Sequence, residues 1–225
     1  MTNPPNTLND LISRRHTCRA FLPTPVARST IESILEAAQQ SPSWGNVQPW
    51  QVTIVSGDAA DAFREAYTRF AQKNEPIAPD FEFPQSYEGV LRDRRRECGW
   101  RLYESVGVKK GDREGSARQT LENFRFFGAP HVAIITTHRC LGTYGAVDAG
   151  AYLANFILAA QDLGVASAPQ AALASYPQFI RSHLGISDDR NVVVGVSFGY
   201  EDTAHAANNF RTGRAPLDEV VTWID

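Results

Sequence analysis

Residues 148–163, with the sequence DAGAYLANFILAAQDL, decide the fold expected for this chain. Apolar side chains lie nearly all round a helix formed by this segment, which predicts a central, buried helix. Gly164 follows directly and is placed to close the helix as a C-cap. The segments on either side, 131–137 (HVAIITT) and 191–198 (NVVVGVSF), are short, apolar and rich in β-branched residues, which predicts buried strands.

Further elements are expected on both sides of this centre. They are helices over 7–14, 28–40, 58–73, 92–103, 113–127 and 175–184, and a strand over 51–55. Residues 74–90 are rich in proline and aromatic residues and have no clear period, which predicts a long loop near the active site or an interface. Helices and strands interleave without a linker or repeat. We therefore expect one α+β or α/β domain over 1–225, with one sheet under several helices.

Two of these helices carry signals for where they begin or end. Ser29 and Glu32 have the spacing of a capping box at the start of the helix over 28–40. Ser175 is placed to cap the last short helix and Gly185 to stop it.

The composition describes a folded chain with little net charge. Of 225 residues 43% are hydrophobic, and 22 basic and 25 acidic residues leave a formal net charge of −3. This argues against disorder and gives no general attraction to nucleic acid or to an anionic membrane. The run Arg92-Asp93-Arg94-Arg95-Arg96 suggests nucleic-acid binding at first sight, but a solvated helix face with alternating partners is the better interpretation.

The cysteine spacing and the lack of targeting segments argue against several other classes of protein. Cys18, Cys98 and Cys140 are widely spaced and form no CxxC pair, which argues against a disulfide framework and a structural zinc site. Residues 1–11 lack the basic and apolar regions of a signal peptide. The apolar stretch over 145–163 is interrupted by polar residues before it could span a bilayer. We therefore expect a soluble, cytoplasmic protein.

Four short clusters combine residue types that suit a flat, phosphorylated ligand. They are 14–21 (RRHTCRAF), 41–50 (SPSWGNVQPW), 164–172 (GVASAPQAA) and 209–217 (NFRTGRAPL). Arginine forks match phosphate oxygens, and small residues let the backbone approach a planar ring. Each cluster alone also fits an ordinary role, such as a basic turn, a helix-to-strand loop or a tight crossing in the core.

Together and in this order, the clusters resemble the FMN-dependent nitroreductase family, in its branch similar to nitrobenzoate reductases. The motifs that carry the resemblance cover almost the whole chain: RHTxRxF with Pro25-Val26, SPSxxNxQPW, GVASAPQAALASYP followed by LGI and VVVGVSFGY, and a C-terminal RxP. The resemblance implies an α+β nitroreductase-like fold, with a central mixed, mainly antiparallel sheet surrounded by helices. It also implies an intertwined homodimer, which we expect to bury more than about 2,000 Å².

The resemblance implies FMN-binding residues, with no catalytic side chain and no metal. The FMN contacts that it implies come from Arg15, His16, Thr17, Arg19, Ser43, Asn46, Gln48, Pro169, Gln170, Ala171, Arg211 and Arg214. The first three and Arg214 would hold the phosphate and ribityl chain, and Arg19 would lie near the flavin N1/O2 edge, where its charge stabilises the reduced ring. The residues in 43–48 would approach from the neighbouring subunit or flank the ring, and those in 169–171 would lie along it.

One position near the C-terminus departs from the family pattern. Thr212 stands where many relatives have lysine. Whether Arg211 or Thr212 contacts the phosphate stays open at this point.

The implied function is an NAD(P)H-dependent oxidoreductase. Bound FMN would receive a hydride from NADH or NADPH and pass two electrons, in ping-pong fashion, to a nitroaromatic acceptor, giving the nitroso compound and then the hydroxylamine. The chain has no GxGxxG motif, which agrees with a nicotinamide that binds transiently. A quinone, another flavin or a halogenated aromatic is the alternative acceptor. A flavin-binding protein without turnover is the alternative of a different class.

Overall fold

The sheet at the centre of the molecule has four strands in the order β1-β2-β4-β3, and every neighbouring pair is antiparallel. The computed structural model describes residues 7–225. The strands are β1 (Trp50–Ser56), β2 (His131–His138), β3 (Ala166–Gln170) and β4 (Arg190–Gly199). One isolated parallel bridge, between Thr17 and Ser167, extends the sheet beyond β3. The expected mainly antiparallel character is therefore confirmed, and the parallel part of the predicted mixed sheet is limited to this isolated bridge.

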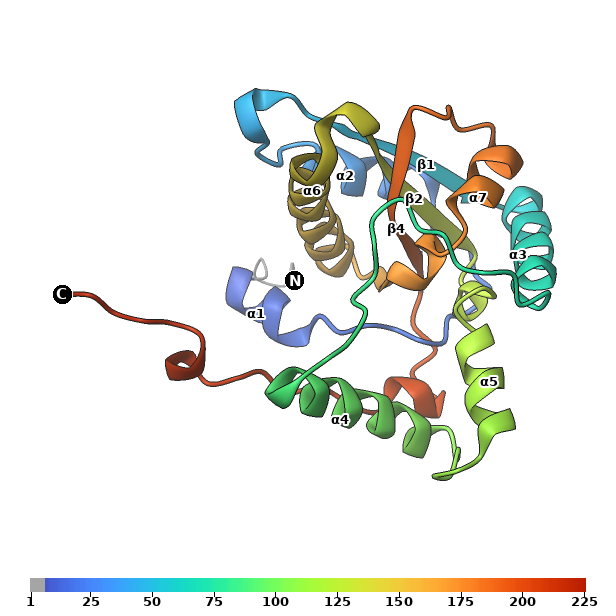
Figure 1. Cartoon of the computed structure of the whole chain (residues 1–225). Coiled ribbons are helices and arrows are strands. Elements are labelled where there is room, and N and C mark those ends of the chain that lie inside the picture. Colours follow the sequence, from blue (N-terminus) through green and yellow to red (C-terminus); the bar gives the residue numbers. More distant parts are fainter. Residues whose placement is uncertain (1–6) are drawn as a thin grey trace, which may run out of the picture.

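Helices cover both faces of the sheet (Figure 1). They are α1 (Leu8–Arg14), α2 (Arg28–Ala38), α3 (Asp58–Ala71), α4 (Gly89–Ser105), α5 (Arg113–Leu121), α6 (Gly142–Asp162) and α7 (Pro177–Leu184). Side chains of β2 alternate between two core layers, because Ala133 and Ile135 pack with α2 and α6 while Ile134 packs with α3 and α7. The α+β class is thus confirmed.

The helix that decided the expected fold is α6, and it is longer than its sequence pattern indicated. It begins at Gly142 rather than at Asp148, and Gly164 follows its end with φ of +72°, as the C-cap signal predicted. Its inner face buries Tyr152 and Phe156 against the sheet, while Tyr144 and Val147 on the outer face are each 60% exposed. A single chain therefore covers only one side of this apolar helix.

Both capping signals were wrong about the residue at the helix start. Helix α2 begins after Ala27 with no side-chain cap, so Ser29 lies inside its first turn. Helix α7 begins at Pro177, whose fixed φ suits the first helical position, and the predicted cap Ser175 belongs to the preceding turn. Gly185 does end α7, in the left-handed conformation at φ +66°.

Two other segments differ from the expected elements. The helix predicted over 113–127 ends at Leu121, and Phe126 and Phe127 adopt positive φ values of +58° and +51° in a short turn. The small-residue run over 164–172 contains β3, which was not expected as a strand. Pro169 is tolerated there because β3 lies at the edge of the sheet, where a missing N–H does not interrupt a ladder.

The C-terminal tail, residues 209–225, leaves the body and projects away from it (Figure 1). It carries four exposed apolar side chains, Leu217, Val220, Trp223 and Ile224. Within residues 7–225, no helix combines the length and apolar character needed to cross a bilayer. The expectation that residues 1–11 form no signal peptide falls partly on residues 1–6, which lie outside the described residues.

Candidate functional site

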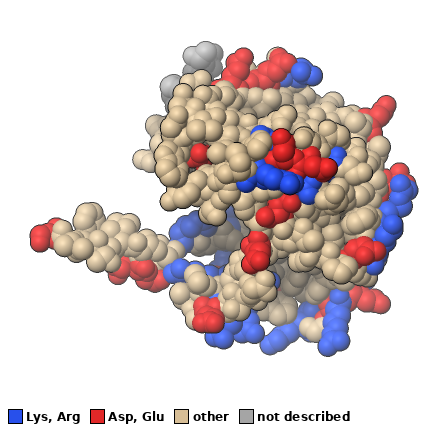
Figure 2. Space-filling model, turned by 45° about the horizontal axis from the view of Figure 1, so that its top comes forward, with Lys and Arg blue, Asp and Glu red and all other residues tan. Residues whose placement is uncertain are grey.

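An arginine-lined cavity, here called the arginine cavity, lies between α1, the outer side of α6 and the start of the C-terminal tail. Its volume is about 490 Å³, within the range of small-molecule pockets. Among its lining residues are Arg15, His16, Thr17, Ala154, Ile157, Leu158, Arg211, Thr212 and Arg214. Basic residues also show in the notch where the tail leaves the body (Figure 2). The first and fourth clusters, from opposite ends of the sequence, therefore build one site.

The two arginines at the centre of this cavity have no acidic partner. Arg15 is half-buried, and burial, followed by the nearby charge of Arg214, lowers its pKa from the ordinary value. Its guanidinium makes no hydrogen bond or ion pair within the part of the chain that the structure describes. Arg214 donates only to neutral oxygens, those of Thr212 Oγ1 at 3.0 Å and of the Gly213 and Thr212 carbonyls at 2.8 and 3.3 Å. Two neighbouring guanidinium groups without a carboxylate suit an anion such as phosphate.

His16 is fixed in place by a residue that the sequence did not single out. Its Nε2 lies 3.0 Å from Glu201 Oε1, and its Nδ1 lies 3.3 Å from the carbonyl oxygen of Arg14. Glu201 Oε1 is an acceptor, so Nε2 is the ring nitrogen that donates to it. Glu201 lies two residues after the end of β4, and no local pattern indicated that it would meet the N-terminal cluster.

The third cluster joins the first through the edge of the sheet. The Cys18 N–H donates to the Ser167 carbonyl at 3.0 Å, which places Thr17 beside β3. A second cavity of about 440 Å³ is lined by His16, Arg211 and the segment from Gly164 to Ala166, among others. Since His16 and Arg211 line both cavities, three of the four sequence clusters meet in one region.

Gln170 is buried, and its side chain is occupied by core contacts. Its Nε2 donates to the Asn123 carbonyl at 2.9 Å, and the Ser197 hydroxyl donates to its Oε1. A ligand near this strand end would therefore meet the backbone of Gln170 rather than its amide. Pro169 is half-buried and Ala171 is exposed beside it. Neither Asn123 nor Ser197 was distinguished by the sequence.

Arg19 lies next to the arginine cavity but does not line it. Its backbone N–H donates to Asn208 Oδ1 at 2.7 Å, and its guanidinium lies 5.5 Å from the centre of the Phe210 ring. Burial lowers the pKa of Arg19. Asn208 is buried and also donates to the Ala20 and Asp202 carbonyls, so it fixes this turn to the C-terminal segment. Asn208 is a positioning residue that sequence reasoning missed.

The second cluster, residues 41–50, lies apart from the other three. The Gln48 N–H donates to Ser43 Oγ at 2.9 Å, and the Gln48 Nε2 donates to Asn46 Oδ1 at 3.3 Å. Gly45, Asn46 and Gln48 have φ of +59°, +57° and +50°, a region that residues other than glycine rarely adopt. Such a conformation in an exposed loop is typical of functional segments.

Both the loop over 41–50 and the arginine cavity contact α6, so positions along this helix give the distance between them. The Trp44 N–H donates to Asp148 on the first part of α6 at 3.2 Å, whereas the cavity is lined by Ala154 to Leu158 of the same helix. Six to ten helical residues correspond to about 9–15 Å. Within one chain, Ser43, Asn46 and Gln48 therefore do not line the arginine cavity.

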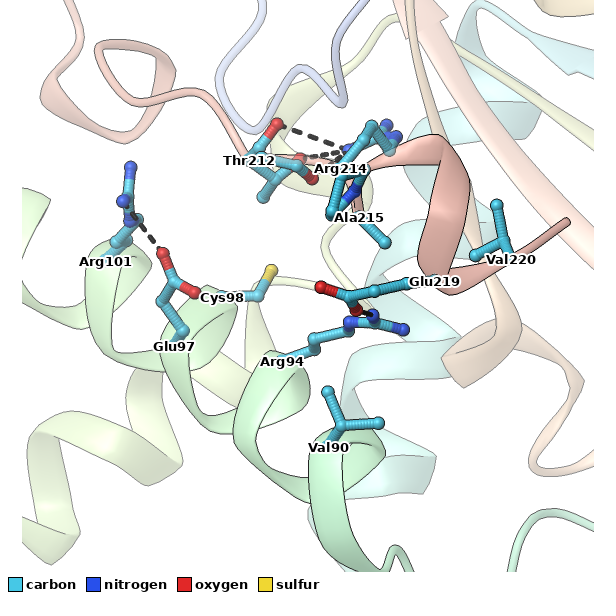
Figure 3. Close-up of a pocket in the computed structure, with 12 residues that line it drawn as sticks. Val90, Arg94, Glu97, Cys98, Arg101, Thr212, Arg214, Ala215, Glu219 and Val220 are labelled. Carbon is cyan, nitrogen blue, oxygen red and sulfur yellow. Dashed lines mark hydrogen bonds and ion pairs between the residues drawn. The ribbon is translucent and has the colours of Figure 1, made fainter.

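A larger cavity, about 610 Å³, lies between α4 and the tail (Figure 3). Arg94 pairs with Glu219 of the tail at 2.5 Å, and Arg101 pairs with Glu97 at 2.8 Å. Thr212 and Arg214 line both this cavity and the arginine cavity, so the two adjoin.

The basic run on α4 has acidic and aromatic neighbours. Arg92 lies 3.5 Å from Asp93, Arg94 pairs with Glu219, and Arg95 lies over the Tyr87 ring at 4.9 Å. All of residues 92–96 are exposed, as expected for a solvated helix face. Within residues 7–225, no group of three or more His, Cys, Asp or Glu side chains is arranged to hold a metal ion.

Comparison with known proteins gives a consistent result. A model described as the nitroreductase family matches residues 12–200. Nitroreductase NfnB of Mycolicibacterium smegmatis is 38% identical over 214 residues, which cover 95% of this chain and 91% of that protein. The 4-nitrobenzoate reductase of Pseudomonas putida is 32% identical over 204 residues, covering 91% and 89% respectively.

Solved structures are similar over the same length. The crystal structure of the FMN-dependent nitroreductase NfnB from Mycobacterium smegmatis in complex with NADPH gives a TM-score of 0.91 at 36% identity, covering 96% of this chain and 97% of that chain. The FMN and NADPH-dependent nitroreductase NfnB from Sphigopyxis sp. strain HMH gives a TM-score of 0.93 at 33% identity, covering 98% and 100%.

Proposed function

Because the chain belongs to the nitroreductase family, we propose that it is an FMN-dependent NAD(P)H oxidoreductase that reduces nitroaromatic compounds by two-electron transfer. The observation that carries the proposal is the arginine cavity, where Arg15 and Arg214 meet without an acidic partner. The named relatives are similar over nearly their full length, so their chemistry is the expected chemistry of this chain.

The residues of the arginine cavity fit the phosphate of FMN. Arg15 and Arg214 would donate charge-assisted hydrogen bonds to its oxygens, and the Thr17 hydroxyl would complete the set. Arg211 also lines the cavity and donates to the Asn208 carbonyl at 2.7 Å. It would add a further positive charge near the phosphate, in place of the lysine that many relatives have at the position of Thr212. His16 is held towards the site by Glu201.

The remaining residues would surround the flavin ring. When bound, FMN accepts the hydride of NAD(P)H and delivers two electrons to the acceptor. Arg19 would offset negative charge at one edge of the ring. Pro169, the backbone of Gln170 and Ala171 would lie along the ring at the uncharged end of β3. None of these side chains needs to exchange a proton for the hydride to move, so we assign no catalytic side chain.

We also propose a homodimer in which the loop over 41–50 of each protomer reaches the FMN held by the other. One observation in support is the distance of this loop from the arginine cavity within one chain. Another is a set of exposed apolar side chains on α1, this loop and α6: Leu8, Ile12, Trp44, Val47, Tyr144 and Val147. A dimer that covers this surface would bury more than about 2,000 Å².

A single domain over 1–225 and a cytoplasmic location complete the proposal. Both core layers are formed by one continuous sheet, which supports one domain. Cys18, Cys98 and Cys140 are free thiols, as is common in a reducing compartment.

A visible spectrum tests the proposed activity. We expect a yellow protein that absorbs near 450 nm, as flavins do at about that wavelength, and that is bleached anaerobically by NADPH or NADH and recoloured by 4-nitrobenzoate. Bleaching without recolouring would point to a quinone, another flavin or a halogenated aromatic as the acceptor. Flavin that is bound but never bleached would indicate a non-catalytic flavin-binding protein, and a protein that takes up no FMN would contradict the proposal entirely.

The arginine cavity is tested by FMN titration of two variants. Replacing both arginines (Arg15→Ala with Arg214→Ala) removes the phosphate donors, and we expect FMN to bind at least about 100-fold more weakly, since a hydrogen bond to a charged group contributes about 1.5–3 kcal/mol. Arg28→Ala is the matched control, because Arg28 is exposed and pairs only with Glu32 on α2. Equal FMN affinity in both variants would place the phosphate elsewhere.

A further inference from the structure

A cysteine, a histidine and an aspartate lie together on the surface at the end of β2, outside the proposed flavin site. Cys140 Sγ is 3.0 Å from His138 Nδ1, and His138 Nε2 is 3.2 Å from Asp189 Oδ2. The Cys140 residue is exposed, and the side chains of His138 and Asp189 are 42% and 52% exposed. A nucleophile, a base and a group that orients the base are thus in hydrogen-bond reach in the order that activates a nucleophile.

The backbone determines which ring nitrogen of His138 accepts. The Cys140 N–H donates to His138 Nδ1 at 3.2 Å, so this nitrogen carries a lone pair. The ring proton of neutral His138 is therefore on Nε2, where it is donated to Asp189. Nδ1 is therefore the acceptor for the proton of the Cys140 thiol, and its single lone pair is shared between this thiol and the Cys140 N–H.

His205, which caps a similar short turn, shows which contacts of His138 helix capping alone explains. His205 Nδ1 accepts from the Ala207 N–H at 3.2 Å, in a short turn of the same kind. There the residue two positions on is alanine, and no described carboxylate pairs with the His205 ring. Capping therefore accounts for the bond from the Cys140 N–H, but it accounts for neither the thiol nor Asp189.

The other two cysteines lack these features. Cys18 is buried, donates to the Ala20 carbonyl at 3.1 Å, and has its pKa raised to about 12 mainly by burial. Cys98 is half-buried and lines the cavity between α4 and the tail, with Arg94 and Arg101 but no histidine beside it. Cys140 is thus the one thiol of the three that combines exposure with a histidine base.

We propose that Cys140 is a reactive thiol that forms a mixed disulfide with small anionic disulfides of the glutathione type. His138 Nδ1 takes the Sγ proton, and the resulting thiolate attacks one sulfur of the disulfide. The new bond joins Cys140 Sγ to that sulfur, the original sulfur–sulfur bond breaks, and the departing thiolate takes the proton from His138. Asp189 keeps the imidazole oriented. Arg139, which precedes Cys140 in the sequence and whose guanidinium donates to the Asp188 carbonyl, offers a cation to the carboxylates of the incoming molecule.

Peptide mass mapping after incubation of the FMN-loaded protein with oxidised glutathione tests the proposal without any variant. We expect the adduct on Cys140 to form at least about ten times faster than any adduct on Cys98, because thiolate character and exposure set the rate of exchange. An adduct that forms on Cys98 first, or at the same rate, overturns the proposal.

Two variants separate the base from the cap. Asparagine is a good capping residue, so His138→Asn keeps an acceptor for the Cys140 N–H and removes only the base. We expect modification of Cys140 to slow at least about tenfold in His138→Asn, since a general base supplies ~10²–10⁴-fold in rate, and to slow less in Asp189→Asn. Unchanged thermal melting shows that both variants are folded. A His138→Asn variant that reacts as fast as the wild type contradicts the role of the base, and the same result in Asp189→Asn contradicts the positioning role.

Discussion

The two faces of α6 carry side chains of similar character but lie in different surroundings. The inner face presents Ala149, Tyr152, Phe156 and Ala160, which are buried against the sheet. The outer face presents Tyr144, Val147, Ala151, Ala154 and Leu158 at helical spacing, and within one chain these side chains are exposed or half-buried. The apolar pattern alone therefore predicts burial of both faces, and it does not distinguish the face that is buried within the chain from the face that a second molecule would cover.

The outer face also differs in what it adjoins. Ala154, Ile157 and Leu158 form one wall of the arginine cavity, so a surface proposed for the dimer continues directly into the proposed flavin site. The inner face supports the fold, and in the proposed dimer the outer face would link assembly to cofactor binding. Four measurements test this difference between the two faces.

The largest effect is expected on the inner face. Phe156→Ala removes a fully buried ring that packs against Phe198 at 5.6 Å between ring centres, and we expect the free energy of unfolding to fall by about 3–5 kcal/mol. Denaturant titration measures this loss. Val147→Ala on the outer face is the control, and we expect its effect to appear mainly as a change in how the unfolding midpoint depends on protein concentration. Similar losses at all concentrations in both variants would mean that the two faces are equivalent.

The next effect is expected at the proposed dimer surface. Ala151→Glu places a carboxylate in the middle of the outer face, and burying an unpaired charge costs several kcal/mol, so we expect the dimer to dissociate at least about 100-fold more readily. Sedimentation equilibrium measures the association constant. Ala59→Glu makes the same chemical change on the exposed side of α3 and should leave association unchanged. Equal association in the two variants would remove α6 from the interface.

A smaller effect is expected where the outer face meets the arginine cavity. Arg15→Lys keeps the positive charge but replaces a planar fork with a single ammonium group, and we expect FMN to bind about tenfold more weakly, a difference of ~1.4 kcal/mol. Fluorescence titration with FMN gives the dissociation constant. Affinity equal to that of the wild type would show that Arg15 acts only through its charge.

The smallest effect is expected on the pH dependence of the free energy of unfolding, from a buried histidine beneath the inner face. His131 stacks on Phe198, its Nε2 accepts from the Val26 N–H at 2.8 Å, and burial lowers its pKa from the ordinary value of 6.5. As the pH falls, His131 is protonated in the unfolded chain before it is protonated in the folded protein. The contribution of neutral His131 to the free energy of unfolding is therefore complete above about pH 6.5 and is lost as the pH falls towards the lowered pKa of the folded state. Denaturation curves at pH 7.5 and at successively lower pH measure it.

The matched control for this prediction is His131→Gln. The variant cannot take up the proton, so its stability should decline less steeply below pH 6.5 than that of the wild type. Parallel curves would assign the pH dependence to other groups.

The core elements could be predicted because their sequences are unambiguous. The run HVAIITT became β2, which is almost wholly buried, and the apolar segment around Phe156 became α6. Strand β3 was missed because Ala166 to Gln170 are small or polar residues with little preference for strands. The predicted caps Ser29 and Ser175 failed because Ala27 and Pro177 lie where the helices actually begin, without any side-chain cap.

The sequence pointed to the arginines that the structure brings into one cavity, and not to the residues that hold the predicted site residues in place. The resemblance pointed to Arg15 and Arg214, which the structure brings together. Glu201, Asn208 and Asn123 hold His16, the Arg19 turn and Gln170, through contacts between residues that are far apart in the sequence. Local spacing carries no signal for such contacts, because each depends on the completed fold.

The joining of Arg15 and Arg214 also has a consequence for how the protein is made. The two arginines are about 200 residues apart, so the second emerges from the ribosome last. At roughly 5–20 residues per second, synthesis of the intervening chain takes on the order of 10–40 s. The central strand β4 ends at Gly199, 15 residues before Arg214, so the four-stranded sheet and the proposed phosphate site are completed at nearly the same stage of synthesis. Capture of the proposed cofactor would then follow translation, and a message that lacks its last 12 codons would yield a chain without Arg214 and with only half of the proposed phosphate site.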